Sequence, residues 1–259
     1  MIHNIIKDKG TRLFIVLAGF FVANALIAES IGVKIFSLED TMGWERASFS
    51  LLGTDNLSFS LSVGVVPWPV IFVLTDIINE YYGVKGVRFL SILTAVLIAF
   101  AFFIFYFAIH TAPDTAFWIS SYSKEGVPDM QAAFSAIFGQ GMNIIVGSIA
   151  AFIIGQIADA FVFRKIKTIT GENRIWARAT VSTLFSQLID SFVVTYIAFY
   201  IFRGVSFGQC TAWALTSYSY KFLIAILFTP VIYGVHWIVE RYLGKERAAA
   251  MKAAAMRGY

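Results

Sequence analysis

Six long apolar segments constrain the fold of this chain more than any other feature. They span roughly residues 12–36, 59–82, 87–111, 130–163, 176–202 and 212–242. Each is long enough to cross a bilayer, which takes about 20 mostly apolar residues in a helix. None alternates apolar and polar residues with a period of two, so helices are expected rather than barrel strands. The sequence therefore predicts an all-α integral membrane protein, with six transmembrane helices in a compact bundle that forms a single domain over residues 1–259.

The basic residues are distributed unevenly between the connections. Fifteen of the 20 lysines and arginines lie in the two tails and in the connections after the second and fourth segments, whereas three lie in the opposite connections. Cytoplasmic loops of membrane proteins carry such an excess. Both termini are therefore expected in the cytoplasm. The net charge of +4 reflects this topology and gives no reason to expect a nucleic-acid partner.

The second segment carries an unusual number of groups that lipid disfavours. Two prolines, the residue between them and three polar side chains fall within it: Pro67, Pro69, Trp68, Asp76, Asn79 and Glu80. The prolines remove backbone hydrogen bonds, so the second helix is expected to be broken near them. An ionisable side chain inside a membrane helix costs about 2.5–3.5 kcal/mol. Asp76 is therefore a candidate for substrate contact, while Glu80 lies nearer the cytoplasmic end and can equally be interfacial.

The fourth and fifth segments share a short motif. Residues 155–163 read GQIADAFVF and residues 186–194 read SQLIDSFVV. The spacing places Gln156 with Asp159, and Gln187 with Asp190, on one face of each helix. Polar side chains of this kind can contact a substrate or ion, or can join neighbouring helices by hydrogen bonds.

Further polar residues lie in the first and last segments. Asn24 is a candidate for substrate contact in the first segment. Lys221 lies about two turns into the sixth, where an ammonium group needs a carboxylate partner. Asp190 and Glu29 are the candidates for that partner.

Signatures of an enzyme are absent from the sequence. The three histidines lie near segment ends, and no Gly-x-Ser-x-Gly, His-Glu-x-x-His or phosphate-binding loop occurs. The single cysteine excludes an internal disulfide framework. We therefore expect neither catalysis nor a bound metal or cofactor.

Two motifs resemble those of a known family. Residues 74–83, LTDIINEYYG, followed by Lys85 and Arg88, are similar to the signature of the queuosine precursor transporter family, also called the vitamin uptake transporter family. Residues 186–191, SQLIDS, resemble that family's second signature. The resemblance implies secondary transport in a bacterial inner membrane that takes up 7-deazaguanine precursors of the tRNA nucleoside queuosine. These are 7-cyano-7-deazaguanine, its 7-aminomethyl relative and queuine.

The polar residues suit such a planar, purine-like ligand. A carboxylate can accept both donors of a guanine-type edge, and a glutamine amide can donate to the neighbouring carbonyl. An aromatic face can stack on the ring system. We expect Asp76 or Asp190 to accept the amidine edge. The other expected polar contacts are Gln187, Gln156 and Asn79, and Trp68 or a nearby phenylalanine is expected to stack on the ring.

Two other functions are compatible with a six-helix membrane protein. The alternative is the substrate-binding subunit of an energy-coupling-factor vitamin importer, which would need an ATPase partner. A non-transporting scaffold or membrane enzyme is opposed by the deep acidic residues and by the missing catalytic groups. Ion coupling and oligomeric state, including a homo-oligomer, stay open.

Overall fold

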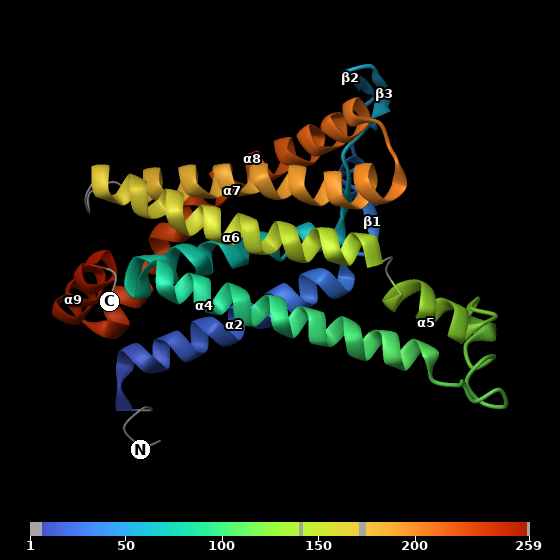
Figure 1. Ribbon diagram of the computed structural model, residues 1–259, viewed down its shortest axis with the longest axis horizontal. Coiled ribbons are helices and arrows are strands. Elements are labelled where there is room, and N and C mark those ends of the chain that lie inside the picture. Colours follow the sequence, from blue (N-terminus) through green and yellow to red (C-terminus); the bar gives the residue numbers. More distant parts are fainter. Residues whose placement is uncertain (1–6, 140–141, 171–174, 258–259) are drawn as a thin grey trace.

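The protein is predominantly helical, and its long helices lie side by side in a bundle (Figure 1). The computed structural model describes residues 7–139, 142–170 and 175–257. In chain order the α-helices are α2 (Lys9–Ile31), α3 (Leu38–Met42), α4 (Trp68–His110), α5 (Met130–Phe138), α6 (Met142–Thr170), α7 (Ile175–Thr195), α8 (Phe207–Leu243) and α9 (Lys245–Arg257). A π-helical stretch, Tyr196–Ile201, extends α7. Short 3-10 turns lie at Val63–Val65 and Ser123–Glu125.

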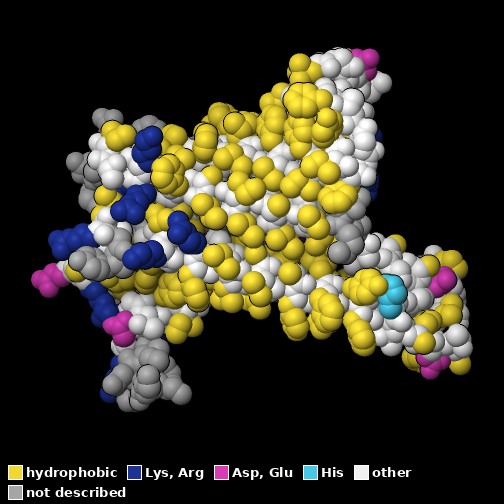
Figure 2. Space-filling view, in the orientation of Figure 1, with side chains coloured by type: hydrophobic (Ala, Val, Ile, Leu, Met, Phe, Trp, Pro, Cys, Tyr) yellow, Lys and Arg dark blue, Asp and Glu magenta, His cyan; other side chains and the backbone are white. Residues whose placement is uncertain are grey.

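Five helical stretches of the described chain are long and apolar enough to cross a membrane. They are Lys9–Ile31, Val63–His110, Ile145–Thr170, Ala179–Ile201 and Phe207–Leu243. Large apolar side chains such as Phe20, Phe103 and Leu227 are exposed on them. Figure 2 shows apolar side chains covering the middle of one face, while Lys and Arg side chains gather toward one end. Such a surface is suited to lipid, so the chain is an all-α membrane protein.

Helix α4 is longer than a single crossing requires because the chain reverses within it at Gly83 (Figure 1). Its 43 residues would extend over about 64 Å if straight. Gly83 has φ 72° and ψ 179°, a conformation essentially restricted to glycine. The reversal yields a first arm (68–82) and a second arm (84–110), which cover most of the second and third predicted segments.

The prolines lie at the beginning of α4 and do not interrupt a continuous helix. Pro67 is the residue before the first turn and Pro69 lies within that turn. Proline is tolerated there because the N–H that it lacks would have no partner inside the helix. The expected helical segment 59–82 was therefore too long at its start, since residues 60–62 form a strand.

The fourth predicted segment, 130–163, is also divided in the structure. Helix α5 ends at Phe138 and α6 begins at Met142, with residues 140–141 outside the described part of the chain. Helix α6 then continues past residue 163 to Thr170. Uniform hydropathy concealed the division, because α5 and α6 are both apolar.

The connection between α2 and α4 has its own structure. It contains two small antiparallel sheets, which pair β1 (Ile35–Ser37) with β4 (Ser60–Ser62) and β2 (Phe49–Leu51) with β3 (Thr54–Leu57). Glu39 on α3 is buried and accepts hydrogen bonds from the Phe59 N–H (2.9 Å) and the Ser37 hydroxyl (3.2 Å). Burial raises the pKa of Glu39, but these hydrogen bonds outweigh burial and hold it below its ordinary value. The ionised carboxylate therefore joins the two halves of this connection.

The first arm of α4 forms the centre of the bundle. Ile71, Ile77 and Ile78 on it are completely buried. The arm packs between α2 and α6, and α9 covers its end, where the backbone of Ala255 meets Gly83. The beginning of α2 and the end of α8 also meet near α9, so both ends of the described chain lie at the same end of the bundle (Figure 1).

We predict that Gly83→Ala loosens this end of the bundle. A Cβ at Gly83 would lie 2.9 Å from the Ala255 carbonyl oxygen, and the backbone conformation disfavours any side chain. The free energy of unfolding should fall by about 1–3 kcal/mol, measured by thermal denaturation in detergent. Gly19→Ala is the matched control, because a Cβ there meets nothing within 4 Å. Equal stability of the two variants would contradict the role given to Gly83.

Candidate functional site

A pocket opens between the first arm of α4, α7 and α8. The free space that its residues border is about 500 Å³ when the space open to the surroundings is included. Each helix contributes residues at intervals of three or four positions, which places them on one helix face. The residues used below are Trp68, Phe72 and Asp76 from α4, Thr183 and Gln187 from α7, and Tyr220, Lys221 and Phe228 from α8.

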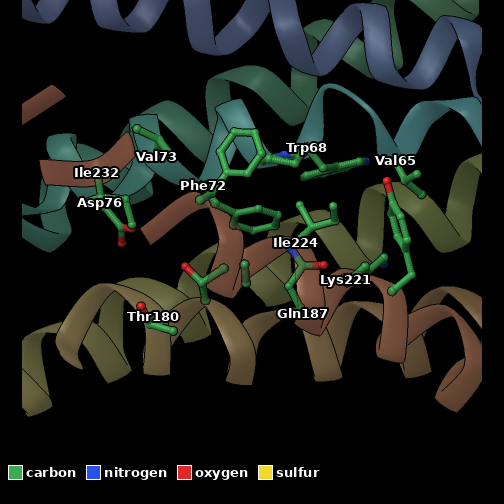
Figure 3. Close-up of a pocket in the computed structure, with 15 residues that line it drawn as sticks. Val65, Trp68, Phe72, Val73, Asp76, Thr180, Gln187, Lys221, Ile224 and Ile232 are labelled. Carbon is green, nitrogen blue, oxygen red and sulfur yellow. The ribbon is translucent and has the colours of Figure 1, made fainter. Parts of the chain in front are cut away.

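The pocket has aromatic walls with a few polar groups between them. Trp68 and Phe72 are stacked on each other, with ring centroids 5.7 Å apart and planes inclined by 26°. Figure 3 shows these rings on the α4 side and Gln187 reaching toward them from α7, with Asp76 toward one end of the pocket. A mostly apolar cavity with a few convergent polar groups is typical of a small-molecule site.

Two polar side chains of α7 are available to a ligand. Gln187 and Thr183 are both largely buried and line the pocket. The Thr183 hydroxyl has no hydrogen-bond partner among the described residues. Because a buried hydroxyl without a partner is costly, a bound molecule that completes its hydrogen bonding would be favoured.

Lys221 and Asp190 form an ion pair at the edge of this pocket. The Lys221 Nζ lies 2.5 Å from Asp190 Oδ2, and both side chains are mostly buried. This confirms Asp190 as the partner of Lys221. Lys221 lines the pocket, whereas Asp190 lies behind it on α7. Asp190 therefore holds the ammonium group in place rather than lining the cavity itself.

The two related motifs on α6 and α7 pack against each other in antiparallel fashion. The Ser186 hydroxyl donates to Asp159 (3.2 Å), and the Cβ position of Gly155 lies 3.8 Å from the Cβ of Asp190. The first residue of each motif, Gly155 or Ser186, thus lies close to the aspartate of the other motif. The glutamines of the two motifs nevertheless have different surroundings. Gln187 lines the pocket, whereas Gln156 lies outside it and accepts a hydrogen bond from the Thr75 hydroxyl (2.9 Å). Gln156 and Asp159 consequently join α4, α6 and α7.

Glu80, which the sequence allowed to be either a substrate contact or an interfacial residue, is enclosed by neighbouring helices. It is completely buried and lies 2.9 Å from the Lys167 Nζ of α6. Lys252 of α9 lies 4.0 Å from Glu80 and 2.6 Å from Glu240 of α8. These four side chains connect four helices at the end of the bundle covered by α9.

Two other candidates lie away from the pocket. Asn79 donates to the Ala160 carbonyl (3.2 Å), which joins α4 to α6. Asn24 donates to Phe20 one turn earlier in its own helix (2.8 Å). Among the sequence candidates, the structure thus brings together Trp68, Asp76, Gln187 and Lys221.

Sequence reasoning missed several aromatic and hydroxyl residues of the pocket. Phe72, Thr183, Tyr220 and Phe228 line it but were not singled out. A signal was present for Phe72, which lies midway between Trp68 and Asp76 on the same helix face. Tyr220 and Phe228 had no such signal, because the chain has 11 tyrosines and 26 phenylalanines and most of its helix surface is apolar.

Comparison with known proteins finds a matching family model and several related transporters. Residues 62–235 match the model of the family described as "Putative vitamin uptake transporter". The "Queuosine precursor transporter" of Escherichia coli is 29% identical over 76% of this chain and 83% of that protein. The "Probable queuosine precursor transporter" of Bacillus subtilis is 28% identical over 66% of this chain and 70% of that protein.

A third relative covers more of the chain. The "Probable queuosine precursor transporter" of Haemophilus influenzae is 24% identical over 89% of both proteins. No solved structure shows significant similarity to the chain. The matched residues 62–235 contain the first arm of α4, all of α6 and α7, and the pocket-lining part of α8. The chain therefore belongs to the vitamin uptake transporter family.

Proposed function

We propose that this protein imports 7-deazaguanine precursors of queuosine and binds them in the pocket between α4, α7 and α8. The observation that carries the proposal is that Asp76 and Gln187, from the two sequence motifs, line the same pocket beside Trp68. The names of the curated relatives support the substrate class. The candidate substrates are 7-cyano-7-deazaguanine, 7-aminomethyl-7-deazaguanine and queuine.

The pocket offers a complementary group for each part of such a ligand. The Asp76 carboxylate can accept the ring N–H and the exocyclic amine of the guanine-type edge. Gln187 and the Thr183 hydroxyl can serve the neighbouring carbonyl. Trp68, Phe72 and Phe228 supply faces on which a planar ring can stack, each contributing about 1–3 kcal/mol by analogy with base stacking.

Asp76 is a better candidate than Asp190 for the amidine edge. Asp190 is held by Lys221 at 2.5 Å, whereas Asp76 lines the cavity directly. In this arrangement Asp190 positions Lys221, and the ammonium group can donate to an acceptor on the ligand. One carboxylate thus binds the substrate and the other orients a second binding group.

We propose that the chain crosses a bacterial inner membrane six times and that both of its termini lie in the cytoplasm. The two arms of α4 account for two of the crossings. Both ends of the described chain lie at the same end of the bundle. The excess of lysine and arginine in the tails and in the connections that follow the first α4 arm and α6 supports a cytoplasmic location for that end.

Loss of the Asp76 carboxylate should abolish most uptake. Asp76→Asn removes a charge-assisted acceptor and should lower ligand affinity about 10- to 100-fold. Thr183→Val should cause a smaller loss, because it removes one hydroxyl without changing the shape of the pocket. The measurement is uptake of labelled 7-cyano-7-deazaguanine into cells that lack their own transporter.

Asp55→Asn is the matched control for this experiment, since Asp55 is exposed in the connection before α4. Wild-type uptake by Asp76→Asn would contradict the site. Uptake by purified protein in liposomes without ATP should persist. Strict dependence on an added ATPase would contradict secondary transport and favour an energy-coupling-factor subunit.

Variants of the Lys221–Asp190 pair are predicted to affect thermal stability and uptake differently. Lys221→Met leaves the Asp190 carboxylate in a largely buried position, and breaking such a pair costs about 3–5 kcal/mol. The double variant Lys221→Met, Asp190→Leu should regain thermal stability in detergent but not uptake. Wild-type uptake by the double variant would show that the pair is only structural.

The proposed orientation can be tested with single cysteines, because Cys210 is the one native cysteine. In a Cys210→Ser background, Lys124→Cys places an exposed thiol in the connection before α5, and Lys165→Cys places one near the C-terminal end of α6. A membrane-impermeant maleimide added to intact cells should label Lys124→Cys. It should label Lys165→Cys only after the membrane is permeabilised. The reverse pattern would contradict the orientation.

A further inference from the structure

A second pocket lies at the reversal of α4 and contains only basic charges among its described residues. Lys85 and Arg88 from the second arm of α4 and Arg164 from α6 line it, together with Tyr82, Gly83, Val84 and Ala255. The free space that these residues border is about 510 Å³ when the space open to the surroundings is included. The three basic side chains are exposed.

Each arginine in this pocket is followed or preceded by an exposed aromatic side chain within one helical turn. Phe89 next to Arg88 is 61% exposed, and Phe161 one turn from Arg164 is 64% exposed. Further exposed apolar residues, Ile92 and Ile157, continue these two surfaces away from the pocket. The cluster of positive charge thus adjoins an apolar helix surface that is suited to contact lipid chains.

We propose that this pocket binds the phosphate headgroup of an anionic membrane phospholipid, with the acyl chains lying against the surface near Phe89 and Phe161. Three cations without an acidic residue in the lining complement a phosphate that carries negative charge, and arginine can bind phosphate oxygens through two parallel hydrogen bonds. Basic pockets between membrane helices at the cytoplasmic side are suited to such headgroups. The adjoining apolar surface favours a lipid over free phosphate.

The site is separate from the proposed transport pocket. No residue is shared between the two linings. Arg164 also donates to the Met256 carbonyl of α9 (3.4 Å), and Ala255 lies in the wall. A headgroup bound here therefore contacts α4, α6 and α9 together, and it should stabilise the end of the bundle at which these helices meet.

The test compares lipid binding by the full chain and by variants of the three cations. The variant Lys85→Gln, Arg88→Gln, Arg164→Gln should bind phosphatidylglycerol about 100-fold more weakly than wild type. Native mass spectrometry and the rise of Tm on adding phosphatidylglycerol to protein in a neutral detergent both measure this. A control variant with the same change of charge, Lys7→Gln, Lys165→Gln, Lys245→Gln, removes exposed cations outside the pocket and should bind as wild type does.

Three further comparisons make the result decisive. Phosphatidylcholine should give no comparable rise of Tm, and inorganic phosphate should neither raise Tm nor displace the lipid at equal concentration. The variant Lys85→Arg, Arg88→Lys, Arg164→Lys keeps the charges and should retain binding, which separates loss of charge from misfolding. Unchanged phosphatidylglycerol binding by the glutamine variant would overturn the proposal, as would equal stabilisation by inorganic phosphate.

Discussion

In lipid, a charged or polar side chain inside the bundle must find its partner within the protein, and the arrangement of the helices follows from this constraint. Glu80 pairs with Lys167 at 2.9 Å, and Asp190 pairs with Lys221 at 2.5 Å. Each pair joins two different helices. The first pair fixes α4 to α6 near α9, and the second fixes α7 to α8 beside the pocket. The pocket lies among the helices that these two ion pairs connect.

Along the first arm of α4, some polar residues fasten the helix to its neighbour and others line the pocket. Thr75 bonds to Gln156 and Asn79 to Ala160, so this part of the arm is fastened to α6. Asp76, one residue after Thr75, lines the pocket with Trp68 and Phe72. A helix held on one side can present its other side to a ligand with little loss of side-chain freedom on binding. Such preorganisation increases affinity because less freedom is lost when the ligand binds.

Sequence reasoning predicted the membrane class and named Asp190 as one of two candidate partners of Lys221, because hydropathy and the cost of a buried charge are local properties. It did not predict the burial of Glu80 against Lys167, because the covering of that end by α9 depends on packing between distant parts of the chain. Gln156 and Gln187 occupy equivalent places in their motifs, yet Gln156 bonds to Thr75 while Gln187 lines the pocket. Only the position of α4 against α6 and α7 distinguishes them. For the same reason, Tyr220 and Phe228 could not be selected from so many aromatic residues.

The most direct test of the proposed site is the position of the ligand itself. An experimental structure of the protein with bound 7-cyano-7-deazaguanine should place the ring system against Trp68 or Phe72. Its amidine edge should lie within hydrogen-bond distance of Asp76, and its carbonyl should lie near Gln187. A ligand bound outside the pocket between α4, α7 and α8, or bound there without contact to Asp76, would contradict the account.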